Sequence, residues 1–159
     1  MKDIKGIEEI LLKCRTCHVA MADGDMPYVV PLNYGYRITE DNSLELYFHS
    51  APEGKKLDIL KRNNKVCFEI SDEGERIEAE SPCEMGYYYS SIIGNGEAIF
   101  IDDAPGKCEG LSIIVRHQAG IDATFTESQA ENVCVFKIVS ASFTGKRKKN
   151  AVKHGGDYE

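Results

Sequence analysis

No apolar run in this chain of 159 residues is longer than four residues, and tryptophan is absent. A membrane-spanning helix needs about 20 apolar residues and a signal peptide about 7 to 15, so neither is predicted and we expect a cytoplasmic protein. Positive charge is also scarce, because acidic residues outnumber basic ones 26 to 19 and the net charge is −7. Such a surface disfavours nucleic acid and anionic membranes as partners. The length and the apolar content of 42% predict one domain over residues 1–159, with a basic tail from about residue 147.

Signatures of several large enzyme classes are missing as well. The chain contains no G-x-S-x-G nucleophile elbow, no Walker loop and no G-x-G-x-x-G fingerprint. Acyl transfer, ATP hydrolysis and Rossmann-type dinucleotide binding therefore lack their usual sequence support. The side chains alone indicate no catalytic machinery.

The six cysteines raise the question of disulfides, haem or metal. Without an export signal, reduced thiols are expected. Cys14, Cys17 and His18 match the C-x-x-C-H pattern of covalent haem attachment, but the following residues read as a strand rather than the loop and helix expected around a haem. A zinc site would need a second ligand pair, and a thioredoxin-like pair should precede a helix rather than follow one. We interpret Cys14 and Cys17 as small residues at a helix-to-strand junction and predict no metal site.

Apolar periodicity predicts a chain dominated by short strands. Helices are predicted over 3–14, over about ten residues from Lys55 and over 104–118, and strands over 16–22, 27–38, 44–50, 65–71, 87–101 and 133–144. The acid-rich residues 69–84 read as a solvated hairpin tip, and Gly94-Asn95-Gly96 predicts a bulge or bend. Strands in meander order with few intervening helices predict a mainly β fold, an antiparallel barrel with peripheral helices.

Lys55 and Lys56 follow Gly54 at the start of the second predicted helix. Helix N-termini carry partial positive charge, so two lysines in the first turn are unfavourable unless an anion compensates them. A bound phosphate would do so, because the free N–H groups and the lysines can hold it together. The alternative is that both lysines are solvated surface residues.

A second basic cluster, Lys146 to Lys149, directly follows the last predicted strand. Residues 146–159 carry five bases and two acids, so they are +3 while the rest of the chain is −10. Lys146 lies next to the strand end and is the credible ligand of this cluster, whereas the others read as a solvated tail.

Two further sites offer polar groups near strand ends. His49 closes the third predicted strand, where it could bond a ligand or be satisfied within the protein. Residues 87–91, Tyr-Tyr-Tyr-Ser-Ser, offer aromatic surface and hydroxyls on the long strand. Alternation along the strand prevents all three tyrosines from facing the same way.

Five blocks occur in a specific order. They are PYVVPLNYGY (27–36), LYFHSA (46–51), EGKK (53–56), VCFE (66–69) and YSSIIGNG (89–96). Together they resemble the pyridoxamine 5'-phosphate oxidase-like FMN-binding split-barrel family, and within it the branch of the nitroimidazole-resistance proteins. The similarity runs from the first predicted helix to Thr144-Gly145-Lys146.

The resemblance implies an antiparallel split β-barrel that forms a homodimer and holds FMN at the subunit interface. Residues 30–33 would follow the isoalloxazine ring, residues 49–50 would lie near the flavin and its ribityl-phosphate arm, and residues 55–56 would bind the phosphate. Residues 90–91 would reach the cofactor from the long strand, and Lys146 matches a basic residue at the end of the final strand. The implied cofactor-binding set is Val30, Pro31, Leu32, Asn33, His49, Ser50, Lys55, Lys56, Ser90, Ser91 and Lys146.

Two departures bear on the activity. The chain lacks tryptophan and lacks the C-terminal substrate-binding segment of the vitamin-forming oxidases, so pyridoxamine phosphate oxidation is not predicted. The resemblance implies instead an FMN-dependent oxidoreductase that passes electrons to a small planar acceptor, for example a nitroaromatic compound, with His49 as a proton donor or substrate contact. The alternative is a non-catalytic module that stores or senses flavin, or binds haem.

Overall fold

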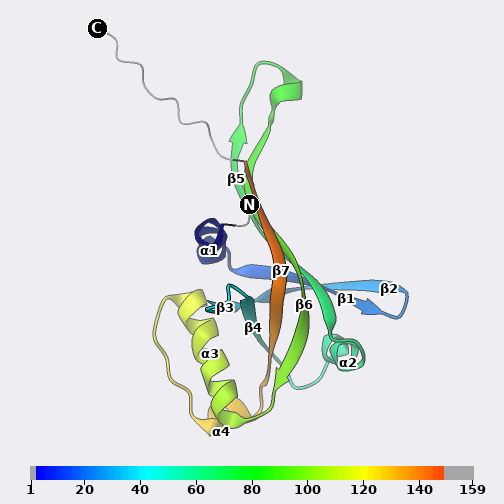
Figure 1. The fold of residues 1–159 in the computed structure, drawn as a ribbon, viewed down its shortest axis with the longest axis vertical. Helices are drawn as coiled ribbons and strands as arrows, with labels where there is room; N and C mark the ends of the chain where they lie inside the picture. Colours follow the sequence, from blue (N-terminus) through cyan, green and yellow to red (C-terminus); the bar gives the residue numbers. More distant parts are fainter. Residues whose placement is uncertain (1–2, 149–159) are drawn as a thin grey trace.

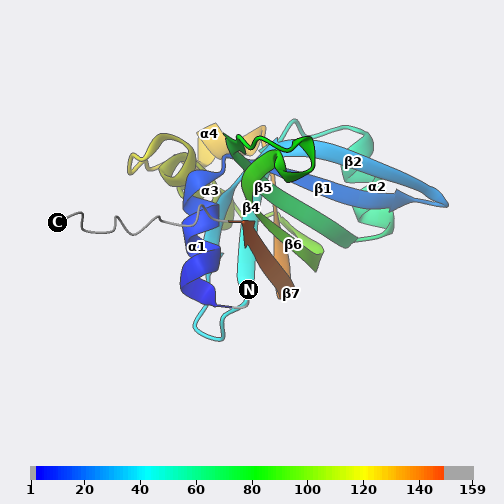
Figure 2. The same cartoon turned by 90° about the horizontal axis from the view of Figure 1, so that it is seen from above.

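One antiparallel sheet of seven strands organises the computed structural model, which describes residues 3–148 (Figures 1 and 2). The elements in chain order are α1 (Ile4–Lys13), β1 (Thr16–Asp23), β2 (Met26–Asn33), β3 (Gly35–Ile38), β4 (Leu44–Ser50), α2 (Lys55–Arg62), β5 (Lys65–Ile77), the 3-10 turn η1 (Pro82–Glu84), β6 (Gly86–Ile101), α3 (Ala104–Ala119), α4 (Glu127–Glu131) and β7 (Cys134–Lys148). The hydrogen-bonded order is β2-β1-β5-β6-β7-β4-β3, so β2 and β3 are the two ends of the sheet. The predicted mainly β fold with peripheral helices is confirmed.

The helices lie around the sheet and begin at residues suited to that position. In α1, the Asp3 carboxylate accepts the N–H of Gly6 at 2.9 Å. In α3, Asp103 caps the helix in the same way and Gly120 ends it with a left-handed φ of 69°. Figure 1 shows α2 beside the β1–β2 end of the sheet and α3 beside β3 and β4. The helices α2 and α3 therefore flank opposite ends of the strand order.

Alternate residues of the strands and one face each of α1 and α2 form the main core. Phe48 of β4 and Phe136 of β7 stack at its centre, with ring centroids 5.2 Å apart. Both are fully buried, as are Phe68 and Ile138. Because each fully buried aliphatic or aromatic side chain contributes about 1.5–3 kcal/mol of transfer free energy, this core dominates the stability of the barrel.

The predicted bend in the long strand β6 is confirmed at the two glycines. A Cβ on Gly94 would lie 2.4 Å from the Phe68 ring, and one on Gly96 would lie 2.5 Å from the Val139 carbonyl oxygen. The pairing of β6 with β7 shifts register between Asn95 and Glu97. The glycines are required because neighbouring strands and rings approach the backbone too closely for any side chain.

The predicted strand over residues 27–38 is wrong, because the chain forms two strands there. β2 pairs with β1, whereas β3 pairs with β4 at the other end of the sheet. Tyr34 lies between them, fully buried, and its hydroxyl donates to the carbonyl of Leu11 at 2.9 Å. The chain therefore crosses from one end of the strand order to the other, and the predicted meander does not continue past β2.

Three other boundaries differ from the predictions. The acid-rich segment is paired strand as far as Ile77, and only residues 78–85 form the hairpin tip that projects from the barrel (Figure 1). The final strand continues to Lys148, so Lys146 lies within β7 rather than after it. The short helix α4 was not predicted, although Thr126 and Gln129 form the capping box that marks its start.

The cysteines are free thiols. Cys17 is fully buried, and burial raises its pKa strongly; burial also raises the pKa of Cys14 to about 11. Thiols of this kind stay protonated and unreactive at neutral pH, which agrees with a packing role for the C-x-x-C pair. Within residues 3–148, no helix is long and apolar enough to cross a membrane, and no group of three metal-ligating side chains occurs.

Glu45 of β4 is the centre of a buried charge network. Its carboxylate accepts hydrogen bonds from Lys137 at 2.5 Å and from the Tyr47 hydroxyl at 2.7 Å. Burial opposes ionisation, but the bonds from Lys137 and Tyr47 outweigh it and lower the pKa of Glu45. A lowered carboxyl pKa stabilises the folded state above the unfolded pKa, about 4.3, and this contribution is lost as the pH falls.

We expect Glu45→Gln to reduce the free energy of unfolding by about 2 kcal/mol at pH 7, because Lys137 loses its buried carboxylate partner. The loss should shrink between about pH 5 and pH 3, where the native carboxylate is itself being protonated. Urea unfolding at several pH values measures it, with the exposed Glu97→Gln as control. A loss that does not change with pH would contradict the assigned role.

Candidate functional site

The start of α2 holds the predicted lysine pair. Gly54, the N-cap residue, provides no side-chain cap, and a Cβ placed on it would meet no atom within 4 Å. The Lys55 ammonium lies 3.0 Å from the Asp23 carboxylate and 4.9 Å from the centre of the Tyr28 ring. Lys56 is half-buried and forms no hydrogen bond or ion pair within residues 3–148. The helix start therefore has no side-chain cap, and one of its two cations has no partner in the part of the chain that the structure describes.

Asp23, at the end of β1, is a member of this site that sequence reasoning missed. Its carboxylate binds Lys55 and also accepts from Arg62 at 2.8 Å, and these two hydrogen bonds lower its pKa. Asp23 therefore supplies part of the negative charge that compensates the lysines at the helix start. No local pattern connects it to α2, because the contact spans 32 positions of the sequence.

The predicted ring-binding strand β2 alternates between two environments. Val30 and Leu32 pack against the core, while Pro31 and Asn33 are exposed. The Asn33 side-chain nitrogen donates to the carbonyl of Arg15 at 3.1 Å and to Gln118 at 3.3 Å. Only the side-chain oxygen of Asn33 thus remains for a ligand. As an end strand of the described sheet, β2 also leaves one edge of its backbone without a strand partner.

His49 and Ser50 end β4 and lead through residues 51–54 to the helix start. His49 is exposed and lies opposite Val135 of β7. The Ser50 hydroxyl donates to the carbonyl of Ala51 at 2.9 Å. Four residues separate Ser50 from Lys55 along the chain.

The remaining predicted residues lie on β6 and β7. Ser91 is half-buried and faces Lys146 in the strand register, and the Lys146 ammonium lies 5.8 Å from the centre of the Tyr89 ring. Ser90 is buried, with 8% of its surface exposed, and points to the opposite side from Ser91. Of the two serines, only Ser91 is placed to meet a ligand together with Lys146.

One chain does not bring all these residues together. The helix-start group consists of His49, Ser50, Lys55 and Lys56, and the strand group consists of Asn33, Ser91 and Lys146. Asn33 pairs with Thr16 at one end of β1, whereas Lys55 contacts Asp23 at the other end. The eight residues of β1 span about 23 Å, so Asn33 and Lys55 are separated by more than hydrogen-bonding reach.

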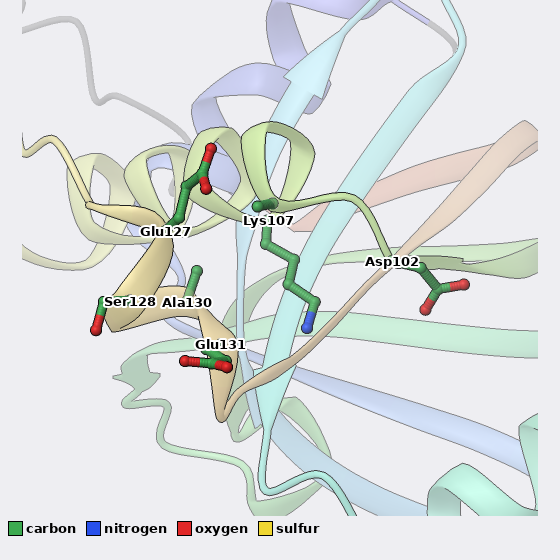
Figure 3. A pocket seen from close by; sticks show the side chains of 7 residues that line it. Asp102, Lys107, Glu127, Ser128, Ala130 and Glu131 are labelled. Carbon is green, nitrogen blue, oxygen red and sulfur yellow. The ribbon is translucent and has the colours of Figure 1, made fainter.

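A cavity of about 430 Å³ between α3 and α4 contains none of the predicted residues. Figure 3 shows Lys107 extending into it from α3, with the carboxylates of Asp102 and Glu127 pointing away. A single lysine on an open surface cavity indicates no chemistry, and we do not include it in the candidate site.

The family model described as pyridoxamine 5'-phosphate oxidase matches residues 3–147. The chain belongs to this family. Among solved structures, a candidate 5-nitroimidazole antibiotic resistance protein from Bacteroides thetaiotaomicron is 34% identical, with a TM-score of 0.78 and coverage of 91% of this chain and 84% of that one. Membership of the family, predicted from the five sequence blocks, is thus confirmed, and with it the split barrel.

More distant structural neighbours share the fold alone. An FAD and heme binding protein from Mycobacterium smegmatis is 15% identical with a TM-score of 0.78, covering 94% of this chain and 73% of that one. An FAD-binding protein from Mesorhizobium loti is 21% identical with a TM-score of 0.65, covering 91% and 93%. No curated protein matches the chain.

Proposed function

We propose that the protein binds FMN between two copies of the chain and acts as an oxidoreductase on a small planar acceptor. The observation that carries this proposal is the helix start of α2, where two lysines meet an N-terminus without a side-chain cap and Lys56 has no partner among the described residues. A phosphate monoester supplies the missing negative charge, and the helix N–H groups and lysines hold it by charge-assisted hydrogen bonds. FMN ends in such a phosphate, and the family and several of its structural neighbours are connected with flavins.

A homodimer completes the site in this proposal. Asn33 of the strand group and Lys55 of the helix-start group contact opposite ends of β1, about 23 Å apart in one chain. A two-fold axis that stacks two sheets would bring the strand group of one copy to the helix-start group of the other. Exposed apolar side chains on β2 and β6 support a contact between two copies, since Val29 is 59% and Ile93 is 53% exposed.

When bound, FMN would supply the two-electron transfer from a reduced donor to the acceptor. The chain's own groups bind and orient it. Lys55 and Lys56 of one copy hold the phosphate. From the second copy, the free edge of β2 and the side-chain oxygen of Asn33 meet the polar edge of the ring, and Ser91 and Lys146 approach the cofactor as well. His49 carries a proton to the acceptor. The similarity to the Bacteroides protein favours a nitroaromatic acceptor.

The absorbance spectrum of the purified protein tests the proposal. We expect a yellow protein with flavin bands that bleach on reduction, return when a nitroaromatic acceptor is added, and release FMN on denaturation. A dimer by light scattering is expected as well. Protein that is colourless and does not bind added FMN would refute flavin binding, a Soret band would identify a haem protein, and bound flavin that no acceptor reoxidises would indicate a non-catalytic carrier or sensor.

A further inference from the structure

A second cavity, of about 490 Å³, lies between α1, β3 and α3, and the proposed flavin site does not use it. Its polar lining includes Glu8, Arg15, Tyr36 and His117, and its apolar lining includes Leu12 and Ile113. Leu12 is 56% exposed although it is a large apolar side chain. A concave apolar surface with a few converging polar groups is the usual form of a small-molecule site.

His117 of α3 is nine-tenths buried at the base of this cavity. Its Nε2 lies 2.9 Å from the carbonyl oxygen of Cys14, which can only accept, so Nε2 carries the proton. Burial lowers the pKa of His117, so the ring is neutral and Nδ1 is an acceptor. Within residues 3–148 no donor bonds to Nδ1, and no fully buried side-chain nitrogen lacks a partner, so Nδ1 keeps some access to solvent. Because His117 lines the cavity, we infer that this access is from the cavity.

Tyr36 of β3 contributes a hydroxyl beside this ring. The Tyr36 and His117 rings pack edge to face with centroids 5.2 Å apart. Burial, with the nearby Glu8 carboxylate, raises the pKa of Tyr36 to about 12, so its hydroxyl stays protonated and can donate. That hydroxyl has no hydrogen-bond partner in the part of the chain that the structure describes.

Two of the four charged side chains that line the cavity form ion pairs. Arg116 is neutralised by Asp122 at 2.7 Å, and Arg37 by Glu109. Arg15 and Glu8 form no ion pair with each other or with any other described residue.

Arg15 is nevertheless held in place. Its guanidinium donates to the carbonyls of Leu12 and Cys14 at 2.6 and 3.0 Å, beyond the end of α1. Arg15 and Glu8 line the cavity together with Tyr36 and act on the pKa of Tyr36 in opposite directions. A cation and an anion that form no ion pair with any described residue therefore line the cavity beside one tyrosine.

We propose that this cavity binds a small molecule that carries a carboxylate and an ammonium group on an apolar body, the chemistry of an apolar or aromatic α-amino acid. Arg15 and the Tyr36 hydroxyl bind the carboxylate. Glu8 and the Nδ1 atom of His117 accept from the ammonium group, and the side chain packs on Leu12 and Ile113. A ligand of one charge sign would leave either Arg15 or Glu8 uncompensated, which disfavours simple acids and simple amines. The site does not depend on flavin binding.

Calorimetric titration of the whole protein with L-phenylalanine tests this proposal. We expect binding of L-phenylalanine at least about tenfold tighter than that of 3-phenylpropionate, which lacks the ammonium group, and of phenethylamine, which lacks the carboxylate. Absence of L-phenylalanine binding at millimolar concentration, or equal binding of either analogue, would overturn the proposal.

Two mild variants locate the site. Glu8→Gln removes an exposed charge and Tyr36→Phe removes a single hydroxyl, so the fold tolerates both; each should weaken L-phenylalanine binding about tenfold. Glu131→Gln, in the cavity between α3 and α4, is the matched control and should leave binding unchanged. Equal affinity in all three variants would place L-phenylalanine elsewhere and refute the site.

Discussion

Replacing both Lys55 and Lys56 with alanine is expected to weaken FMN binding by about a hundredfold or more. Each charge-assisted contact to a phosphate contributes about 1.5–3 kcal/mol, and a factor of ten corresponds to about 1.4 kcal/mol. The two lysines are not equivalent, because Lys55 is already bound to Asp23 whereas Lys56 has no described partner. Lys56→Ala should therefore account for the larger share. Fluorescence titration of the apoprotein with FMN measures both contributions.

Two further variants separate a phosphate site from a general effect of charge. Lys61→Ala removes a lysine from the last turn of the same helix, so it should leave FMN affinity within about twofold of the parent. Asp23→Asn releases Lys55 and removes a nearby negative charge, so it should strengthen FMN binding. If Lys61→Ala weakens binding as much as the double variant does, or if Asp23→Asn weakens it, the phosphate is not held at this helix start.

The parts of the site that the sequence reveals are those whose signal is local. Two lysines directly after a glycine conflict with the helix dipole, and this conflict is visible in the sequence alone. Asp23 was not predictable, because its contact with Lys55 exists only after α2 packs beside the end of β1. The engagement of the Asn33 amide by Arg15 and Gln118 is likewise a tertiary effect.

The fold, like the site, was predictable where its signal is local and was not predictable where it depends on tertiary contacts. Gly94 and Gly96 predicted a bend, because two glycines within a β-rich segment destabilise the folded state unless the backbone there excludes side chains. The crossing between β2 and β3 had no such signal, since Tyr34 is an aromatic residue that is common in strands. The chain turns there because the Tyr34 hydroxyl bonds to the end of α1 and Gly35 packs against the backbone of α3. No local sequence pattern encodes these two contacts.

Gly35 at this crossing should therefore be among the least replaceable residues of the chain. A Cβ on Gly35 would lie 2.7 Å from the backbone carbonyl of Ile113 and 2.7 Å from the Cα of Ile114. These are backbone atoms of a helix, so no rotamer change can relieve the overlap and α3 would have to move away from β3. We expect Gly35→Ala to reduce the free energy of unfolding by about 3 kcal/mol, measured by urea denaturation.

Gly24→Ala is the matched control for this prediction. Gly24 lies in the β1–β2 turn with a φ of 63°, and a Cβ there would meet no atom within 4 Å. Only the cost of a left-handed backbone applies, about 1 kcal/mol. If Gly35→Ala proves no more destabilising than Gly24→Ala, the close packing of α3 against β3 at Gly35 would be contradicted. Because α3 carries His117 and β3 carries Tyr36, Gly35→Ala should also disrupt the cavity between them, whereas Gly24→Ala should leave L-phenylalanine binding intact.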